Sequence, residues 1–258
     1  MRTESIAPSA VTNTAVRGLP RAVRPGTHAL KAETPGNKIV DLLTDFPITH
    51  RRFKRGEHLF RSGDAFTCLY LLNAGFAKTC YLSVDGREQV TGFHMRGDTL
   101  GLDAVVTGHH ACDAIALDVC DILAIPYEAM IKRAQQDPEL IRQVIMAFGT
   151  ELLSDHEQLM SMGSLAADSR VAAFLLELSR RFGERGFSDR ILQLRLTRVE
   201  IGGLLGLKME TVSRAFSRFA KMGLIDVHLR DVTILDMDGL RAIVTMVPEV
   251  ESCARVAA

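Results

Sequence analysis

The sequence predicts an α+β protein with an N-terminal jelly-roll β-barrel, a long helix and a C-terminal winged helix-turn-helix. Three observations carry this prediction. Glycines at positions 56, 63, 75, 86, 97 and 108 separate short apolar runs, which is typical of an all-β barrel. A stripe of apolar residues at helical spacing follows them. Two short helical patterns then meet at Gly206, as in a helix-turn-helix.

Composition limits the class of protein. The 258 residues are 47% hydrophobic and 24% charged, as in globular proteins of one or two domains. No apolar run is long enough for a membrane span, and the polar start after Met1 lacks a secretory signal. The five cysteines are scattered without a CxxC pair, which argues against a disulfide framework or a zinc ribbon and favours a reducing cytoplasm.

Five segments are expected along the chain. Prolines among polar residues predict a flexible N-terminal arm at residues 1–40. We expect the barrel at 41–134, a dimerisation helix at 135–165, the winged helix-turn-helix at 166–245 and a C-terminal tail at 246–258.

Apolar runs mark four strands of the barrel, at 68–72, 76–82, 88–94 and 122–125. The dipeptide Asp85-Gly86 lies between two of these runs and predicts a hairpin, because both residues tolerate positive φ. About eight strands of this kind form a compact jelly roll of two sheets.

A long helix is predicted to begin at Asp137-Pro138, since aspartate is a common N-cap and proline suits the first helical position. Apolar residues recur at intervals of three and four over about 25 residues, or roughly 37 Å of helix. One small barrel cannot cover this length, so we expect the same helix of a second subunit to pair with it in a coiled coil. A helix lying along its own domain is the alternative. The seam of the expected homodimer comprises Phe148, Leu152, Asp155, Leu159 and Met162.

Residues 197–219 have the pattern of a helix-turn-helix. Thr197 and Glu200 form a capping box for the first helix. The small residue Gly202 stands where two helices must cross closely, and Gly206 provides the tight turn. The residues that point into one small core are Ile201, Leu205, Leu207, Val212 and Ala215.

The second helix of this motif carries the candidate functional residues. Its apolar residues face inward, so the opposite face presents Glu210, Ser213 and Arg214. Arginine pairs with guanine in a DNA major groove, glutamate accepts from cytosine, and serine adapts to either. A surface ion pair between Glu210 and Arg214 is the alternative. The residues placed to hold phosphates are Arg198, Lys208, Thr211 and Arg218.

Charge is distributed unevenly along the chain. Its 31 basic and 31 acidic residues cancel overall. Between Ser169 and Arg230, however, twelve lysines and arginines stand against six acids, a net of +6 that leaves −6 for the remainder. A basic C-terminal third is expected of a nucleic-acid module, although chance clustering on a solvated surface gives the same count.

Two further elements complete this domain. An amphipathic helix at 169–182 braces it. Two β-like runs, at 223–228 and 231–235, form a wing after the second helix of the motif. His228 and Arg230 of this wing are candidates for phosphate contacts.

From about residue 45 to residue 245 the chain resembles the Crp/Fnr family of bacterial transcription regulators, above all its Fnr branch. Glu210-Thr-Val-Ser-Arg214 matches the E-x-x-S-R motif with which that branch reads DNA. The resemblance implies a cyclic-nucleotide-binding-like barrel and a homodimeric regulator that binds a TTGAT-type palindrome and controls anaerobic or redox genes. We expect an activator, and a purely repressive role is the alternative. Other matching segments are Gln89–His94, Gly108–His110, Leu178–Phe182, Arg185–Ser188 and Leu205–Leu207.

Departures from the family imply that no cofactor is bound. Fnr proteins hold a [4Fe-4S] cluster with three cysteines ahead of the barrel and a fourth just before an Ile-Pro pair. Residues 1–67 contain no cysteine here, Leu123 occupies the fourth position, and Cys120 lies three residues earlier. The Crp branch grips the phosphate of cyclic AMP with an arginine followed by serine or threonine, which the stretch 108–113 lacks. We therefore expect neither a cluster nor cyclic AMP.

The resemblance also implies partners. The turn Asp85-Gly86-Arg87 resembles the loop through which the family touches RNA polymerase. An acid also occupies the position of Asp155 in the Fnr branch, where its repulsion across the coiled coil keeps the inactive form monomeric, so we expect weak dimerisation. Less favoured alternatives are redox-active thiols at Cys68, Cys80, Cys112 or Cys120 and metal or haem ligation by His109 and His110.

A cupin-type metalloenzyme barrel with an appended helical domain is the competing class. Such a barrel needs a metal set that includes H-x-H, and the spacing of His94, His109 and His110 does not provide it. No nucleophile elbow, phosphate loop or zinc signature occurs elsewhere. We therefore expect no catalytic residue, no metal and no enzymatic activity.

Overall fold

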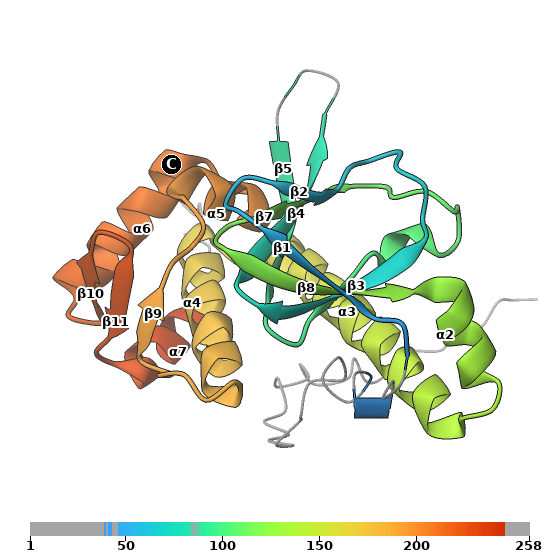
Figure 1. Ribbon diagram of the computed structural model, residues 1–258. Helices are drawn as coiled ribbons and strands as arrows, with labels where there is room; N and C mark the ends of the chain where they lie inside the picture. Colours follow the sequence, from blue (N-terminus) through green and yellow to red (C-terminus); the bar gives the residue numbers. More distant parts are fainter. Residues whose placement is uncertain (1–38, 40, 43–45, 84–85, 87, 246–258) are drawn as a thin grey trace, which may run out of the picture. The chain divides into compact units, whose positions relative to one another are not determined.

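The computed structural model describes residues 39, 41–42, 46–83, 86 and 88–245 (Figure 1). The predicted arm, apart from residue 39, and the predicted tail lie outside these residues. Within them the chain folds into a β-barrel, a long helix and a winged helix-turn-helix, which confirms the predicted fold class. None of the helices in this part of the chain combines the length and the apolar character needed to cross a membrane.

The barrel consists of two four-stranded antiparallel sheets, with strand orders β1-β8-β3-β6 and β2-β7-β4-β5. The four strands predicted from apolar runs are β3, β4, β5 and β8. The hairpin expected at Asp85-Gly86 joins β4 to β5, and its Gly86 has a φ of 78°. The strand bounds are β1 Thr49–Phe53, β2 His58–Phe60, β3 Cys68–Ala74, β4 Phe76–Leu82, β5 Glu88–Met95, β6 Thr99–Leu100, β7 Asp113–Ala116 and β8 Cys120–Pro126.

Strand β3 is apolar without alternation because both of its faces are buried. Tyr70 and Leu72 belong to the hydrophobic cluster inside the barrel. Leu69 and Leu71 belong to a second cluster, which they share with residues of α2 (Tyr127–Ala134) and α3 (Pro138–Ser164). The barrel therefore has an inner core and an outer core, and the outer one anchors the start of the long helix.

Helix α3 begins as predicted. The side chain of Asp137 accepts hydrogen bonds from the backbone N–H groups of Glu139, at 3.0 Å, and Leu140, at 3.3 Å, and Pro138 is the first helical residue. Up to Ala147 the helix buries apolar side chains against the barrel. Beyond that residue it carries several large exposed apolar side chains.

The C-terminal part is a winged helix-turn-helix with a three-stranded sheet of order β10-β11-β9. Its core contains Leu175, Ile201, Val212 and Phe219. The sequence did not mark β9 or α7, which are short and lack a strong pattern of their own. The element bounds are α4 Ala167–Glu184, β9 Ile191–Gln193, α5 Arg198–Leu205, α6 Met209–Lys221, β10 Ile225–His228, β11 Asp231–Ile234 and α7 Met237–Thr245.

Candidate nucleic-acid interface

The turn between α5 and α6 is built as the sequence predicts. Thr197 Oγ1 accepts from the backbone N–H of Glu200 at 3.2 Å, and the Glu200 carboxylate accepts from the N–H of Thr197 at 2.6 Å. Gly206 ends α5 with a φ of 63°. A Cβ atom on Gly202 would lie 2.6 Å from the carbonyl oxygen of Leu207. The two helices can therefore cross at this distance only because residue 202 is glycine.

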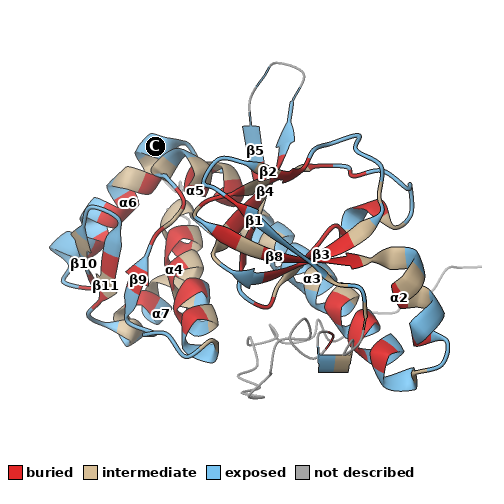
Figure 2. Cartoon of the chain, viewed as in Figure 1, coloured by how far each residue is buried: buried red, intermediate tan, exposed pale blue. Residues whose placement is uncertain are grey.

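Helix α6 separates its buried and exposed faces cleanly. Val212, Phe216 and Phe219 are buried in the domain core. Figure 2 shows that α6 carries both buried and exposed residues along its length. Glu210 and Arg214 are exposed and Ser213 is half-buried, and their spacing places them on one face near the start of the helix. In the part of the chain that the structure describes, Glu210 and Arg214 form no ion pair. Their donors and acceptors are thus available to a ligand, while base reading by the three residues stays a prediction.

The four residues expected at phosphates differ in their surroundings. Lys208 is exposed at the N-cap of α6, and Thr211 is half-buried in the first turn. Arg218 forms an ion pair with Asp168 at 2.7 Å. The guanidinium of Arg198 lies 3.6 Å from the ring centroid of Phe216, and burial lowers its pKa. Phosphate contacts by these residues stay predictions, and Arg218 would have to leave Asp168 to make one.

Most of the basic residues counted between Ser169 and Arg230 are engaged within the protein. Arg181 and Arg185 bind Asp98, Arg195 binds Asp118, and Arg180 binds two glutamates of its own helix. Arg170 and Arg190 donate to backbone carbonyls. The net charge in the sequence therefore overstates the free cationic surface. Five of these side chains have no ion pair or hydrogen bond among the described residues. Arg198 is covered by the ring of Phe216, and the other four are Lys208, Arg214, Lys221 and Arg230, on the turn, α6 and the wing.

The wing is the predicted hairpin. Strands β10 and β11 pair from Ile225↔Ile234 to His228↔Asp231, and residues 229 and 230 connect them. His228 and Arg230 are exposed at its tip. The hairpin lies beside α6 (Figure 1), and Leu224 N donates to Phe219 O at 3.0 Å across the junction.

Side chains of the barrel hold α5 in a way that the sequence did not indicate. Lys78 of β4 is buried and pairs with Glu88 and, at 2.8 Å, with Glu200. Burial alone would lower the pKa of Lys78, but hydrogen bonds to Glu200 and Glu88 outweigh it and raise the pKa. Gln89 donates to the backbone carbonyl of Gly203. No sequence signal links Lys78 to Glu200, which lie 122 positions apart, and Glu200 was assigned only to the capping box.

The predicted dimer seam is partly exposed. Leu152 and Leu159 are 56% and 65% exposed, and Asp155 between them is also exposed. Phe148 packs against the outer core of the barrel, and Met162 lies beside Gly206, so both are half-buried by their own chain. Ile145, which is exposed and seven residues before Leu152, continues the seam toward the N-terminus. Dimerisation stays a prediction.

Glu151 on α3 is a half-buried acid close to this seam. Burial first, and then the negative charges of Asp155 and Asp98, raise its pKa to about 7. Because the folded pKa exceeds the unfolded one, the stabilising contribution is complete below pH 4.5 and is lost as the pH rises toward 7.

We expect Glu151→Gln to remove this pH dependence. The variant should match the wild type in thermal stability near pH 4.5 and exceed it by about 1–2 kcal/mol near pH 8, where the wild-type carboxylate is ionised. Thermal unfolding at both pH values measures the difference. An equal effect of the substitution at the two pH values would contradict the explanation.

The absence of an iron–sulfur cluster of the Fnr kind stays a prediction, and the barrel residues that bear on it are buried. Leu123 is buried in the outer core. The Sγ of Cys120 lies inside the barrel and donates to the carbonyl of Phe76 at 3.1 Å. Burial raises the pKa of Cys120 and of Cys112, and raises that of Cys80 to about 12, so these thiols are protonated. No group of three metal-binding side chains is found among the described residues.

His109 and His110 have different environments. His109 is exposed, with its ring 3.4 Å from the carbonyl of Thr107. His110 is buried and stacks on Phe60 with 3.7 Å between the ring centroids. Burial lowers the pKa of His110, so its ring is neutral at physiological pH. The pair therefore does not converge on one ligand.

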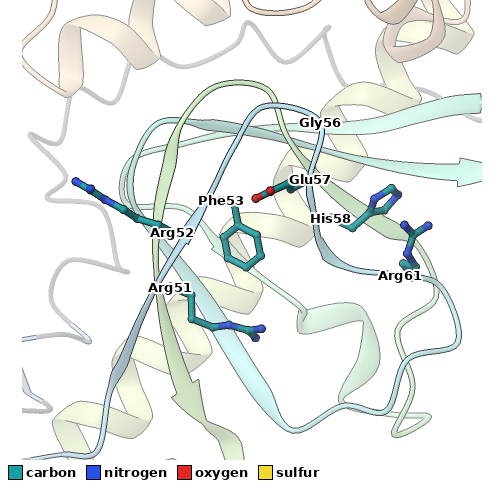
Figure 3. Close-up of a pocket in the computed structure, with 7 residues that line it drawn as sticks. All are labelled: Arg51, Arg52, Phe53, Gly56, Glu57, His58 and Arg61. Carbon is teal, nitrogen blue, oxygen red and sulfur yellow. The ribbon is translucent and has the colours of Figure 1, made fainter.

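An open depression of about 550 Å³ lies beside the edge strand β1 (Figure 3). Arg51 and Arg52 point to opposite sides of the strand, and Arg61 extends from the loop beyond it. The cations do not converge on one point, as an anion site would require. Charged side chains on an edge strand instead discourage pairing with other chains. The residues that line the depression are Arg51, Arg52, Phe53, Gly56, Glu57, His58 and Arg61.

Comparisons with known proteins agree with this architecture. Residues 50–137 match the cyclic nucleotide-binding domain family, and residues 169–243 match the Crp-like helix-turn-helix domain family. The transcriptional activator protein Anr of Pseudomonas protegens is 40% identical over 197 residues, covering 76% of this chain and 81% of that protein. The fumarate and nitrate reduction regulatory protein of Escherichia coli K12 is 36% identical over 201 residues, covering 78% and 80%. The structure of FixK2 from Bradyrhizobium japonicum superposes with a TM-score of 0.71 at 26% identity, covering 78% of this chain and 98% of that one.

Proposed function

The chain belongs to the Crp/Fnr family of DNA-binding transcription regulators, and from this premise we propose that it binds a TTGAT-type palindrome as a homodimer. Glu210, Ser213 and Arg214 make the base contacts in this proposal. The observation that carries it is the exposed patch on α6, where these three side chains stand together and Arg214 has no partner within the described chain. A two-fold dimer presents two such patches, and a palindrome presents two matching half-sites.

The regulator acts as an activator in this proposal, and it has no catalytic activity. The relative from Pseudomonas protegens is named a transcriptional activator. The contact with RNA polymerase is assigned to the β4–β5 turn, at Asp85, Gly86 and Arg87. Gly86 is exposed, while the other two residues lie outside the described part of the chain. Because its ligand is the chromosome, the protein works in the cytoplasm.

We further propose that DNA binding requires neither an iron–sulfur cluster nor cyclic AMP. Leu123 stands at the position of the fourth cluster ligand, and the sequence has no cysteine before Cys68. In the stretch 108–113, Asp113 is bound to the backbone N–H of Ser62 and lies 3.4 Å from His58. Neutral His110 adds no cation to balance Asp113, which disfavours the binding of a phosphate at this stretch.

A fluorescence-anisotropy titration tests the proposed site. Protein purified in air is titrated into a TTGAT-N4-ATCAA duplex and into one with the G·C pair of each half-site swapped, at one fixed salt concentration. We expect tight binding to the first duplex and a loss of about 1–3 kcal/mol for each swapped pair. Equal affinity for both duplexes would refute base reading by α6 at this sequence.

The dimer is tested at Asp155. Two copies of this acid in one coiled-coil seam repel each other, so Asp155→Ala should tighten the dimer about tenfold or more, which corresponds to about 1.4 kcal/mol. Sedimentation equilibrium measures the monomer–dimer constant. Glu157→Ala removes the same charge from another exposed position of α3 and serves as the control. An unchanged constant for Asp155→Ala would rule out the seam.

A further inference from the structure

The tip of the wing carries an exposed leucine in a backbone conformation that glycine normally adopts. Leu229 has a φ of 56° and is the one non-glycine residue with positive φ in the described part of the chain. It is also 91% exposed. Its side chain belongs to none of the hydrophobic clusters of the described residues.

Leucine is an unfavourable residue at this position for two independent reasons. In a two-residue hairpin loop, positive φ is usual for glycine, asparagine or aspartate, because the Cβ of other residues crowds the backbone. A large apolar side chain in water also gains nothing from folding. Glycine would remove the backbone penalty, and it would take no side chain from the hydrophobic clusters of the described residues. Strained residues that nothing in the fold requires are found mostly at ligand-binding sites.

The tip is held on a rigid support. The carbonyl of Arg230 accepts from the N–H of Leu194 at 2.7 Å, which ties the loop to the segment after β9. Val232 and Ile225 anchor β11 and β10 in the domain core. Leu229 is therefore presented at a fixed place relative to α6.

The chemistry around the leucine favours DNA as its partner. His228 and Arg230 flank it, and both are exposed without an ion pair among the described residues. Asp231, the nearest acid, lies one residue further from the tip, opposite His228. In a DNA duplex the backbone and then the minor groove lie beside the major groove. An element that lies next to a helix in the major groove therefore contacts the DNA backbone and the minor groove. Proteins place arginine in narrow minor grooves and insert apolar side chains such as leucine between base steps there.

We propose that Leu229 is an apolar contact in the minor groove beside the major groove occupied by α6. This inference rests on the proposed function, since it takes α6 as the major-groove element. In this proposal Arg230 lies at the same minor groove and provides a positive charge there. The contact senses the width and the minor-groove surface of flanking base pairs, which Glu210, Ser213 and Arg214 do not touch.

The test compares full-length wild type with Leu229→Gly on the TTGAT-N4-ATCAA duplex. Glycine suits the positive φ, so the unfolding midpoint of the variant should equal or exceed that of the wild type. The affinity for the duplex should fall about tenfold, while the discrimination against swapped G·C pairs is retained. Leu235→Ala removes an exposed leucine just beyond the other end of β11 and should leave the affinity unchanged.

A second set of duplexes locates the contact. Replacing A·T by diaminopurine·T adds an amino group to the minor groove and leaves the major groove unaltered. We scan this replacement through the base pairs that flank each half-site. At one or two positions it should weaken wild-type binding and have no effect on Leu229→Gly.

Three results would overturn the proposal. The first is equal affinity of wild type and Leu229→Gly on every duplex. The second is a loss of affinity together with a lower unfolding midpoint. The third is unchanged DNA binding with reduced transcription, which would make the tip a protein contact. If the wild type does not prefer the palindrome, the proposed function fails. The wing contact is judged separately, by the ratio of the affinities of wild type and Leu229→Gly for one duplex.

Discussion

Alanine in place of Arg214 is expected to abolish selective DNA binding. Among the three residues of the α6 patch, only arginine can make two parallel hydrogen bonds to guanine, and each such pair contributes about 1–3 kcal/mol of discrimination. A dimer loses the contact in both half-sites. The variant should therefore bind TTGAT-N4-ATCAA about 100-fold or more weakly and no longer distinguish it from the duplex with swapped G·C pairs.

Lys221→Ala is the matched control for Arg214→Ala. Lys221 lies on the same helix, is exposed and has no partner among the described residues, but it stands at the opposite end of α6. Its loss should weaken binding to all duplexes alike and reduce the slope of affinity against salt by about one or less. If the two variants showed the same salt slope and the same discrimination, Arg214 would be a phosphate contact.

Alanine in place of Gly202 is expected to disrupt the DNA-binding domain as a whole. In a helix interior, replacing glycine by alanine normally stabilises the folded state by about 1 kcal/mol. Here the new Cβ would lie 2.6 Å from the Leu207 carbonyl oxygen, which is backbone and cannot rotate away. The turn must shift, and overpacking of this kind costs about 1–3 kcal/mol. The clash therefore outweighs the helical gain, and Lys208 and the start of α6 move with the turn.

Thermal unfolding and DNA titration together check this expectation. Gly202→Ala should unfold at a lower temperature and bind the palindrome poorly at temperatures where it is still folded. Gly149→Ala is the control, because a Cβ on that glycine of α3 has no described atom within 4 Å apart from those of its chain neighbours and of the surrounding helix backbone. It should stabilise by about 1 kcal/mol. A stabilised Gly202→Ala would mean that the turn adapts without cost.

Local signals predicted most of the DNA-binding domain. The capping box at Thr197, the left-handed Gly206 and the alternation of buried and exposed residues on α6 each act within a few residues, so the sequence alone reveals them. The barrel was predicted from glycine spacing, but β1, β2, β6 and β7 were not marked individually. Strands β2, β6 and β7 have only two to four residues, and β1 is an edge strand with four exposed residues. Edge strands lack the apolar pattern that marks a buried strand.

Contacts between distant segments could not be predicted in this way. The pairing of Lys78 with Glu200 and of Asp98 with Arg185 depends on how the barrel meets the DNA-binding domain. The net charge counted between Ser169 and Arg230 also missed these contacts, because it included Arg185, whose charge is paired with Asp98. Residue type and spacing show which groups carry charge, but only the folded chain shows which of those charges are already neutralised.

Because the barrel cysteines are buried, their reaction rates report how often the barrel opens. A reagent such as a maleimide attacks the thiolate, and Cys80, Cys112 and Cys120 are enclosed and protonated. Each can react only during the fraction of time for which the surrounding strands are transiently separated. The labelling rate is then the rate for an exposed thiol multiplied by the equilibrium constant for that opening. A tenfold slower reaction corresponds to about 1.4 kcal/mol more opening free energy. Alkylation kinetics at Cys80 of β4 and Cys120 of β8 thus measures how firmly these two strands are held in the barrel.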